Sequence, residues 1–290
     1  MNWTTVARLD GVHPGNGVKI ILDSSQPTGV TLTAPGLAPT HNFDGDGHGD
    51  ILWQSGSGMP MVWLMNGTNA VSVGTAGSFN PGPSWQVKGS GDFNGDGKSD
   101  ILWQGSNGMP AIWLMDGTTA VSVGAAGSFN PGPSWHVKGT GDFNGDGKSD
   151  ILWQGDDGTP AIWLMNGAQS TWVGAVGPFA SGALAGWHIK GTGDFNGDNK
   201  SDILWQGDDG QAAIWLMNGT TVIGLGAAGF NPGADWHVVG SGQFNNSDAN
   251  SDILWQNDDG QAAVYLMDGM GVIGSTGIGG TPGADWHLIT

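Results

Sequence analysis

Short apolar segments alternate with glycine-rich polar segments along almost the whole chain, and this alternation repeats about every fifty residues. One unit contains WHVKG, an aspartate-rich loop, ILWQ, a short turn such as GSNG or GDDG, AIWLMNG and a final AVSVG. The connections between the apolar segments are too short for crossover helices, so they predict antiparallel hairpins. Each unit is therefore predicted to fold as a four-stranded antiparallel sheet.

The last aspartate of each loop marks the period of the repeat. These aspartates are separated by 50, 50, 52 and 50 residues, and the two additional residues belong to an insertion within 180–187. They are Asp50, Asp100, Asp150, Asp202 and Asp252. Four strands in about 50 residues are typical of a β-propeller blade, which buries both faces only when blades stack around an axis. We expect an all-β propeller that forms a single domain over residues 1–290.

The number of blades depends on how the two ends of the chain are interpreted. Residues 1–40 have the features of a degenerate partial blade, residues 41–285 hold five repeats, and residues 286–290 form a first strand with no blade after it. We expect six blades, one of them split between the N-terminal segment and this closing strand. In the alternative, the closing strand completes the blade that begins at Asn42, because the segment before it is too short for a first strand. That alternative gives five blades and an N-terminal appendage.

Composition excludes several classes of protein. The 55 glycines follow no three-residue period, which excludes collagen, and 16 tryptophans within a 38% hydrophobic chain argue against disorder. No apolar run approaches the roughly 20 residues of a membrane span, and the absence of cysteine excludes disulfides. A net charge of −18 disfavours nucleic acid and anionic membranes as partners.

The aspartate loops follow the pattern D-x-N-x-D-G-x-x-D, with oxygen side chains at positions 1, 3, 5 and 9. This alternation lets a curled loop direct several oxygens at one centre, and such a ligand set suits a hard cation, calcium more than magnesium. Position 7 is expected to offer its backbone carbonyl while its ammonium points to water. The predicted ligands in the three intact loops are Asp92, Asn94, Asp96, Lys98 and Asp100; Asp142, Asn144, Asp146, Lys148 and Asp150; and Asp194, Asn196, Asp198, Lys200 and Asp202.

Two further copies of the loop depart from this pattern. The first copy has asparagine at position 1, which removes a charge and predicts weaker binding; its ligands are Asn42, Asp44, Asp46, His48 and Asp50. The fifth copy has an extra residue and places Phe244 at position 1, so we expect weak or absent binding by the remaining Asn246, Asp248 and Asp252. The sequence thus predicts about four Ca²⁺ ions, with at most a weak fifth. We expect calcium to contribute to folding, because the carboxylates of each loop repel one another without it.

The segment DFNGDGKSDILWQ resembles the FG-GAP/VCBS repeats, which are the calcium-binding units of integrin α-chain propellers and of many secreted bacterial proteins. The resemblance covers roughly residues 41–290. It implies a β-propeller with calcium in a hairpin loop of each blade, and a role in adhesion, in carbohydrate binding or as a module beside an enzyme. Calcium is not carried over to the fifth loop or to the N-terminal region, where the pattern is lost.

Fourteen of the 16 tryptophans fall at three repeated positions. Those in ILWQ and IWLM are expected to pack between blades. The third set opens the first strand after a glycine-containing loop, and a ring at such an edge suits stacking on the apolar face of a sugar. Packing competes with this interpretation even here, and the neighbouring histidines are expected to be strand-surface residues more than ligands. The candidate ligand-binding residues are Trp85, Trp135, His136, Trp187, His188, Trp236, His237, Trp286 and His287.

The leading functional hypothesis is a calcium-stabilised lectin-like propeller that binds neutral or amino sugars through several equivalent sites. The alternative is a structural or adhesion module that binds a protein surface and belongs to a larger secreted protein. We do not expect an enzyme, since the chain has no cysteine, no glutamate and no GxSxG-type nucleophile. The calcium loops indicate a secreted or cell-surface location, although MNWTTVARLD lacks an apolar signal core.

Overall fold

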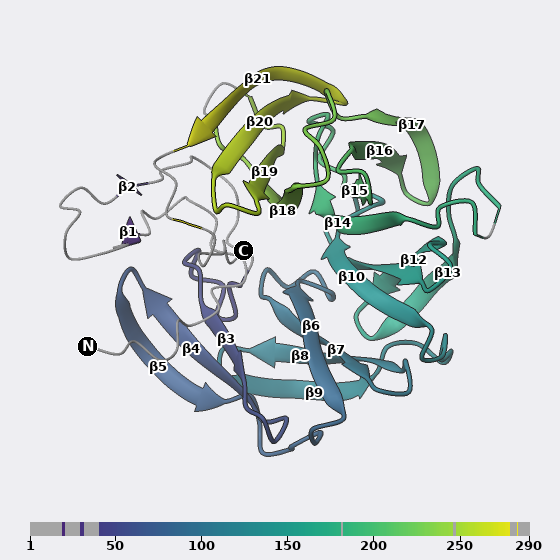
Figure 1. Ribbon diagram of the computed structural model, residues 1–290. Helices are drawn as coiled ribbons and strands as arrows, with labels where there is room; N and C mark the ends of the chain where they lie inside the picture. The colour runs from purple at the N-terminus through teal and green to yellow at the C-terminus, as the bar shows by residue number, and fades with distance from the viewer. Residues whose placement is uncertain are drawn as a thin grey trace.

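The structure is a computed structural model, and in it five β-sheets surround a common axis (Figure 1). It describes residues 19–20, 30–31, 41–180, 182–245, 248–278 and 283. These residues form strands, turns and loops, and none of them makes up a helix that could span a lipid bilayer. The five sheets are the blades of a propeller, in agreement with the all-β fold that the repeat predicts.

Each blade is an antiparallel sheet whose strands follow one another in chain order. Blade 1 has three described strands: β3 (Ile51–Gln54), β4 (Pro60–Asn66) and β5 (Asn69–Thr75). Blade 2 contains β6 (Trp85–Gly91), β7 (Asp100–Gly105), β8 (Pro110–Asp116) and β9 (Thr119–Ala125). Blade 3 contains β10 (Trp135–Gly141), β11 (Asp150–Gly155), β12 (Pro160–Asn166) and β13 (Gln169–Ala175). Blade 4 contains β14 (Trp187–Gly193), β15 (Asp202–Gly207), β16 (Ala212–Asn218) and β17 (Thr221–Ala227). Blade 5 contains β18 (Trp236–Gly242), β19 (Asp252–Asn257), β20 (Ala262–Asp268) and β21 (Gly271–Ile278).

The expected six-blade ring is corrected to five, which is the alternative that the sequence left open. The N-terminal segment contributes β1 (Lys19–Ile20) and β2 (Val30–Thr31), which pair only with each other. A ladder of two residues cannot bury the faces of a blade, and the described residues contain no sixth four-stranded sheet. The strand expected at 286–290 lies outside the described residues.

The hydrophobic core lies between blades rather than within one blade. One cluster joins Phe93 and Ile112 of blade 2 to Trp153 and Trp163 of blade 3. The ILWQ tryptophans of blades 2 to 5 are at most 1% exposed and so have the packing role expected of them. Similar clusters join blade 1 to blade 2, blade 3 to blade 4 and blade 4 to blade 5, so apolar burial by large flat rings holds neighbouring blades together.

In each blade, a turn glycine lies very close to the backbone of the loop that follows the blade. Gly108 adopts a φ of +87°, and a Cβ atom built on it would lie 2.0 Å from the carbonyl oxygen of Gly132. The same closeness recurs between Gly58 and Gly82, Gly158 and Leu184, Gly210 and Gly233, and Gly260 and Gly283. The repeated turn glycine is therefore required both for its backbone conformation and for the contact between blades.

Candidate functional site

Each intact aspartate loop is curled by its own backbone N–H groups. The carboxylate of Asp92 accepts the N–H of Gly95 at 2.7 Å and that of Gly97 at 2.8 Å. The side-chain oxygen of Asn94 accepts the N–H of Asp96 at 2.9 Å. The loops that begin at Asp142 and Asp194 repeat this pattern. These turns keep the side chains of positions 1, 3 and 5 within one tight curl.

The aspartate at position 9 has a structural role in every blade. Asp100 is fully buried, and its two oxygens accept the N–H groups of Phe93 and Met115, both at 2.9 Å. Equivalent pairs of bonds are made by Asp50, Asp150, Asp202 and Asp252. The fifth loop keeps this arrangement although its position 1 is a phenylalanine, so the bonds do not depend on an intact metal loop.

Burial shifts the acidity of these carboxyls. It raises the pKa of Asp100 to about 7, the two backbone hydrogen bonds oppose the shift, and the charges of Asp96 and Asp92 add to it. The pKa of Asp150 and of Asp202 is likewise raised to about 7, and that of Asp50 to about 6. The carboxylates of each loop therefore repel one another near neutral pH, and a cation among them would relieve that repulsion.

The first loop holds an unpaired acceptor at its first position. The N–H of Asn42 donates to the Ser99 hydroxyl of the next blade at 2.9 Å, but its side-chain oxygen is buried and accepts no hydrogen bond. His48 lies outward, with its Nδ1 3.0 Å from a carboxylate oxygen of Asp46. A buried oxygen without a donor is costly, and a cation in the loop would pair with it.

The lysines at position 7 contact neighbouring parts of the protein. The Lys98 ammonium lies 2.5 Å from the carboxylate of Asp116, and this pairing raises the pKa of Lys98. Lys148 and Lys200 are half-buried against the preceding loop, where a Cβ atom at Gly95 or Gly145 would lie 3.3 Å from their side chains. The aliphatic parts of Lys148 and Lys200 make these contacts and Lys98 pairs with an exposed aspartate, so the expectation that the ammonium groups point to water stays a prediction.

The fifth loop does not reproduce the curl of the intact loops. Asp248 accepts the N–H of Asn250 at 3.1 Å, and its carbonyl accepts the amide of Gln243. Asn246, expected as a weak ligand, lies outside the described residues. In the part of the chain that the structure describes, no three His, Cys, Asp or Glu side chains are already gathered around a common point.

The ligand set of the other four loops nevertheless fits a hard cation in its chemistry. Each loop has side-chain oxygens at positions 1, 3 and 5 in one curl, and all of these donors are oxygens. In the second loop they are Asp92, Asn94 and Asp96. The carboxylate at position 9 is already shared between two backbone N–H groups, so positions 1, 3 and 5 would carry most of the coordination.

The first-strand tryptophans lie at the joints between blades. Trp85, Trp135, Trp187 and Trp236 are all half-buried. The amide of Gln104 donates to the carbonyl of Trp135 at 2.6 Å, and the ILWQ glutamines of the other joints do the same. These tryptophan rings therefore pack at the joints and also remain partly exposed to solvent. Trp286 and His287 lie outside the described residues.

The histidines that follow these tryptophans are exposed and are paired with aspartates. His136 Nε2 lies 2.7 Å from Asp156, His188 2.7 Å from Asp208, and His237 2.8 Å from Asp258. Each aspartate belongs to the turn between the second and third strands of the same blade. The histidines are therefore strand-surface residues, as expected, and the structure does not bring them together.

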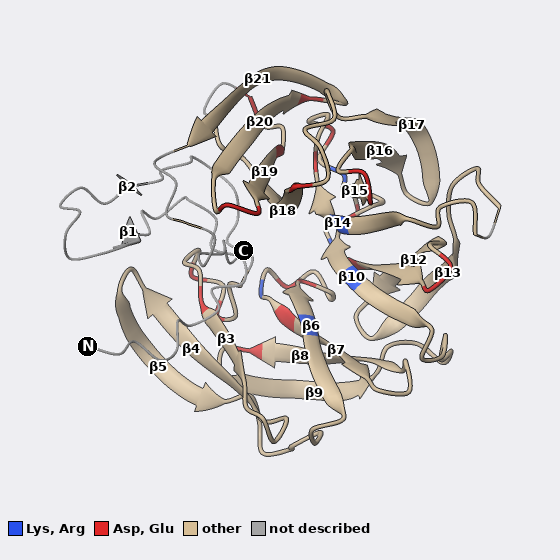
Figure 2. Cartoon of the chain, in the orientation of Figure 1, with Lys and Arg blue, Asp and Glu red and all other residues tan. Residues whose placement is uncertain are grey.

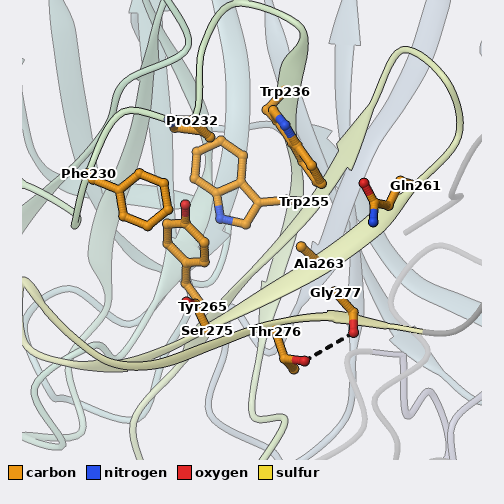
Figure 3. Close-up of a pocket in the computed structure, with 10 residues that line it drawn as sticks. All are labelled: Phe230, Pro232, Trp236, Trp255, Gln261, Ala263, Tyr265, Ser275, Thr276 and Gly277. Carbon is orange, nitrogen blue, oxygen red and sulfur yellow. Dashed lines mark hydrogen bonds between the residues drawn. The ribbon is translucent and has the colours of Figure 1, made fainter.

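An open pocket of about 300 Å³ lies at the joint between blades 4 and 5 (Figure 3). Phe230 and Pro232 reach it from the loop that follows β17, and Trp236 lines it from β18. The remaining lining residues come from blade 5 and are Trp255, Gln261, Ala263, Tyr265, Ser275, Thr276 and Gly277. The ring of Tyr265 lies 5.2 Å from that of Trp255 and 5.5 Å from that of Phe230. Of the candidate ligand residues, Trp236 lines this pocket and His237 does not.

The aromatic arrangement of this pocket recurs in the other blades. The loop phenylalanine packs on the third-strand ring of the following blade in the pairs Phe79–Trp113, Phe129–Trp163 and Phe179–Trp215. The indole N–H groups of Trp53, Trp103, Trp153, Trp205 and Trp255 are all buried without an acceptor. Sequence reasoning missed Phe230 and Tyr265. The repeated phenylalanine of SFNPG and GFNPG, and the only tyrosine at a tryptophan position, were the available signals.

Comparison with known proteins identifies the repeat. Residues 42–103 and 92–153 match the FG-GAP-like repeat family, so this part of the chain carries FG-GAP-like repeats. No curated protein is detectably similar in sequence. FG-GAP-like repeats on a propeller indicate a structural or protein-interaction module, a class that is generally not enzymatic.

Three solved structures show a distant similarity to this chain. The C-terminal WD40 domain of Sif2 is 13% identical with a TM-score of 0.45, over 80% of this chain and 70% of that one. The Dos1 propeller is 9% identical with a TM-score of 0.48, over 80% and 56% of the two chains. Raptor from Chaetomium thermophilum is 14% identical with a TM-score of 0.46, over 85% of this chain and 21% of Raptor. At these identities and scores the similarities say nothing about function.

Proposed function

We propose, from the premise that this chain carries FG-GAP-like repeats, that the propeller is a calcium-stabilised module that binds glycans at several equivalent sites. The observation that carries the proposal is the open aromatic pocket between blades 4 and 5. Its volume of about 300 Å³ lies at the lower end of the roughly 300–1,000 Å³ range of small-molecule pockets. Such a pocket suits one or two sugar rings.

The chemistry of the pocket suits a sugar better than a charged ligand. Trp236 is half-buried, so one ring is open for stacking on the C–H face of a pyranose, while Tyr265 and Phe230 complete the apolar wall. Gln261 and Thr276 add polar side chains for hydroxyl groups. None of the residues lining this pocket is charged, which favours neutral or amino sugars over anionic ones.

Repetition of the aromatic pairs supports multivalent binding. Four joints hold a loop phenylalanine packed on a third-strand ring, so weak equivalent sites would act together on a dense glycan surface. Calcium would be held by positions 1, 3 and 5 of the loops that begin at Asn42, Asp92, Asp142 and Asp194. Sites of this kind are filled where free calcium is abundant, so we place the module in the secreted or cell-surface environment.

A glycan array probed with and without calcium tests this function, followed by titration with the best sugar. Trp236→Ala removes the open ring and should abolish measurable binding at the blade 5 site. Trp172→Ala, which truncates a 38%-exposed tryptophan on β13 away from this pocket, is the matched control and should leave that site unchanged. Equal behaviour of the two variants, or an array without any bound sugar, would refute the glycan proposal.

A second candidate function is protein binding at the rim of the propeller. The outermost strands expose alternate apolar side chains, such as Val121 at 62% and Val123 at 49% on β9. The same is true of Val71, Val73, Val173, Ile223, Leu225 and Ile273. Apolar side chains on exposed strand edges favour contact with another protein. This candidate predicts that Val121→Thr combined with Val123→Thr weakens adhesion to a protein partner while sugar binding is retained.

A further inference from the structure

Three of the chain's eight basic residues occupy one repeated position on neighbouring inner strands. They are Lys88 on β6, Lys138 on β10 and Lys190 on β14. Figure 2 shows the basic residues of these strands near the axis of the ring. The fourth described inner strand, β18, carries Val239 at the same position. Basic residues are therefore concentrated where the inner strands face the axis, in a protein whose net charge is −18.

A β-bulge sets the direction of each of these lysines. In blade 3, Val137 pairs with Trp153 and Gly139 pairs with Leu152, so Lys138 is the extra residue of the ladder. The register shifts at Lys88 and Lys190 in the same way. A bulge redirects the side chain of its extra residue out of the regular alternation. The same local geometry thus repeats on three adjacent strands.

Hydroxyl groups hold the lysine-bearing strands next to each other. Thr140 of β10 donates to the carbonyl of Ser90 on β6 at 2.8 Å. Thr192 of β14 donates to the carbonyl of Thr140 at 2.8 Å. Each bond starts two residues beyond a bulge, so the spacing between neighbouring lysines is fixed by the backbone rather than by flexible loops.

Lys138 and Lys190 are exposed on the inner strands, and Asp156 is the carboxylate whose charge acts on Lys138. Neither makes an ion pair with a carboxylate in the part of the chain that the structure describes. Both side chains are reached by solvent, yet desolvation lowers the pKa of both. The charge of Lys138 lowers the pKa of Lys190 further, whereas Asp156 opposes the shift of Lys138. Two ammonium groups close enough to repel each other favour an anion between them.

We propose that the inner strands of this propeller bind a small doubly charged oxyanion, of the phosphate or sulfate class, between Lys138 and Lys190. Lys88, which donates to the side chain of Gln86 at 3.1 Å, lies at the same position on the next strand. A tetrahedral oxyanion carries up to two charges and presents several acceptor oxygens, so it can bridge separate ammonium groups through different oxygens, whereas a halide offers one atom and one charge. This site is independent of the aromatic pocket and of the aspartate loops.

Equilibrium dialysis with radiolabelled inorganic phosphate tests the site on the full chain, with ionic strength held constant by sodium chloride. Free calcium is held at one fixed concentration in every sample, so that the aspartate loops keep the same occupancy in all variants. We expect the wild type to bind one phosphate saturably, with competition from sulfate. Lys138→Gln combined with Lys190→Gln should weaken the affinity at least about tenfold, because the bridging charges are lost.

The matched control changes two exposed serines of the outer strands β5 and β9, Ser72→Asp combined with Ser122→Asp, and carries the same change in net charge. It should keep wild-type affinity. The proposal is overturned if the wild type shows no saturable phosphate binding, or if the two double variants lose affinity equally. If the inner-strand double variant does not fold, Lys190→Gln is compared with Ser122→Asp under the same criteria.

Discussion

The carboxylate of Asp100 accepts the backbone N–H of Met115 at 2.9 Å, which ties the end of the aspartate loop to the third strand of the blade. Its second oxygen accepts the N–H of Phe93 inside the loop itself. One fully buried side chain therefore fixes both the curl of the loop and its position on the sheet. Because the same pair of bonds is made in all five blades, the loops and the blades depend on each other for stability.

Asp100→Asn should destabilise the protein while leaving the shape of the side chain unchanged. One carboxylate oxygen becomes an amide that faces a backbone donor, so one buried N–H loses its acceptor. We expect a loss of about 1–3 kcal/mol in the free energy of unfolding, measured by denaturant titration. Asp116→Asn is the control. Its side chain is 63% exposed and pairs with Lys98 at the surface, and exposed ion pairs contribute only about 0–1 kcal/mol. Equal losses in the two variants would contradict the structural role of Asp100.

The metal-free protein should become less stable as pH rises from about 4 to about 7. The pKa of Asp100 is about 7 in the folded state, above its ordinary value of 3.8, because burial disfavours the charge. The folded state thus binds more protons than the unfolded state between these two values, so stability falls with rising pH and levels off above the folded pKa. Melting temperatures recorded between pH 5 and pH 8 test this. Asp100→Asn should reduce the slope only in part, because Asp150 and Asp202 have pKa values raised in the same way, and an unchanged slope would count against the assignment.

Calcium should raise the melting temperature in proportion to its occupancy of the loops. A ligand that binds only the folded state at a concentration of 100 times its Kd stabilises it by about 2.7 kcal/mol per site. Differential scanning fluorimetry with calcium, magnesium and a chelator measures the effect. Asp92→Asn combined with Asp96→Asn should remove the part of the calcium-induced rise in melting temperature that comes from one loop. Asp248→Asn in the fifth loop should leave the calcium response unchanged. A melt that is insensitive to calcium would overturn the proposal that the loops bind it.

Gly108→Ala should be far more damaging than Gly132→Ala. The two glycines have nearly the same backbone strain, with φ values of +87° and +90°. A Cβ at position 108 would lie 2.0 Å from the carbonyl oxygen of Gly132, whereas at position 132 it meets nothing within 4 Å. We expect Gly132→Ala to cost about 1–2 kcal/mol, and Gly108→Ala to prevent blades 2 and 3 from closing. Folding yield and melting temperature compare the two, and similar stabilities would contradict the contact between blades.

Much of the fold could be predicted because the repeat is recognisable in the sequence. Antiparallel strands joined by short turns need only local information, so the four-stranded unit followed from ILWQ, the turn glycines and AIWLM. The packing role of the ILWQ tryptophans also followed, since a blade must bury both faces. The blade number did not, because ring closure depends on how the chain ends pair. The N-terminal segment matches the strand pattern, but β1 and β2 pair only over two residues.

The candidate sites were likewise predictable only in part. Spacing alone placed the oxygens of Asp92, Asn94 and Asp96 in one loop, because their alternation is local. It could not show that Asp100 is shared between two backbone N–H groups, nor that Lys98 is paired with Asp116, since these partners lie 15 and 18 residues further along the chain.

The sequence by itself determined the repeating unit, the four-stranded blade and the chemistry of its loops, because each of these is set by residues within a single repeat. Only the tertiary structure decided what lies between blades. The aromatic pocket that joins Phe230 to Tyr265, the glycine contacts, and the row of lysines on the inner strands all depend on how one repeat packs against the next. That packing is fixed by the shape of the assembled ring, and no single repeat contains it.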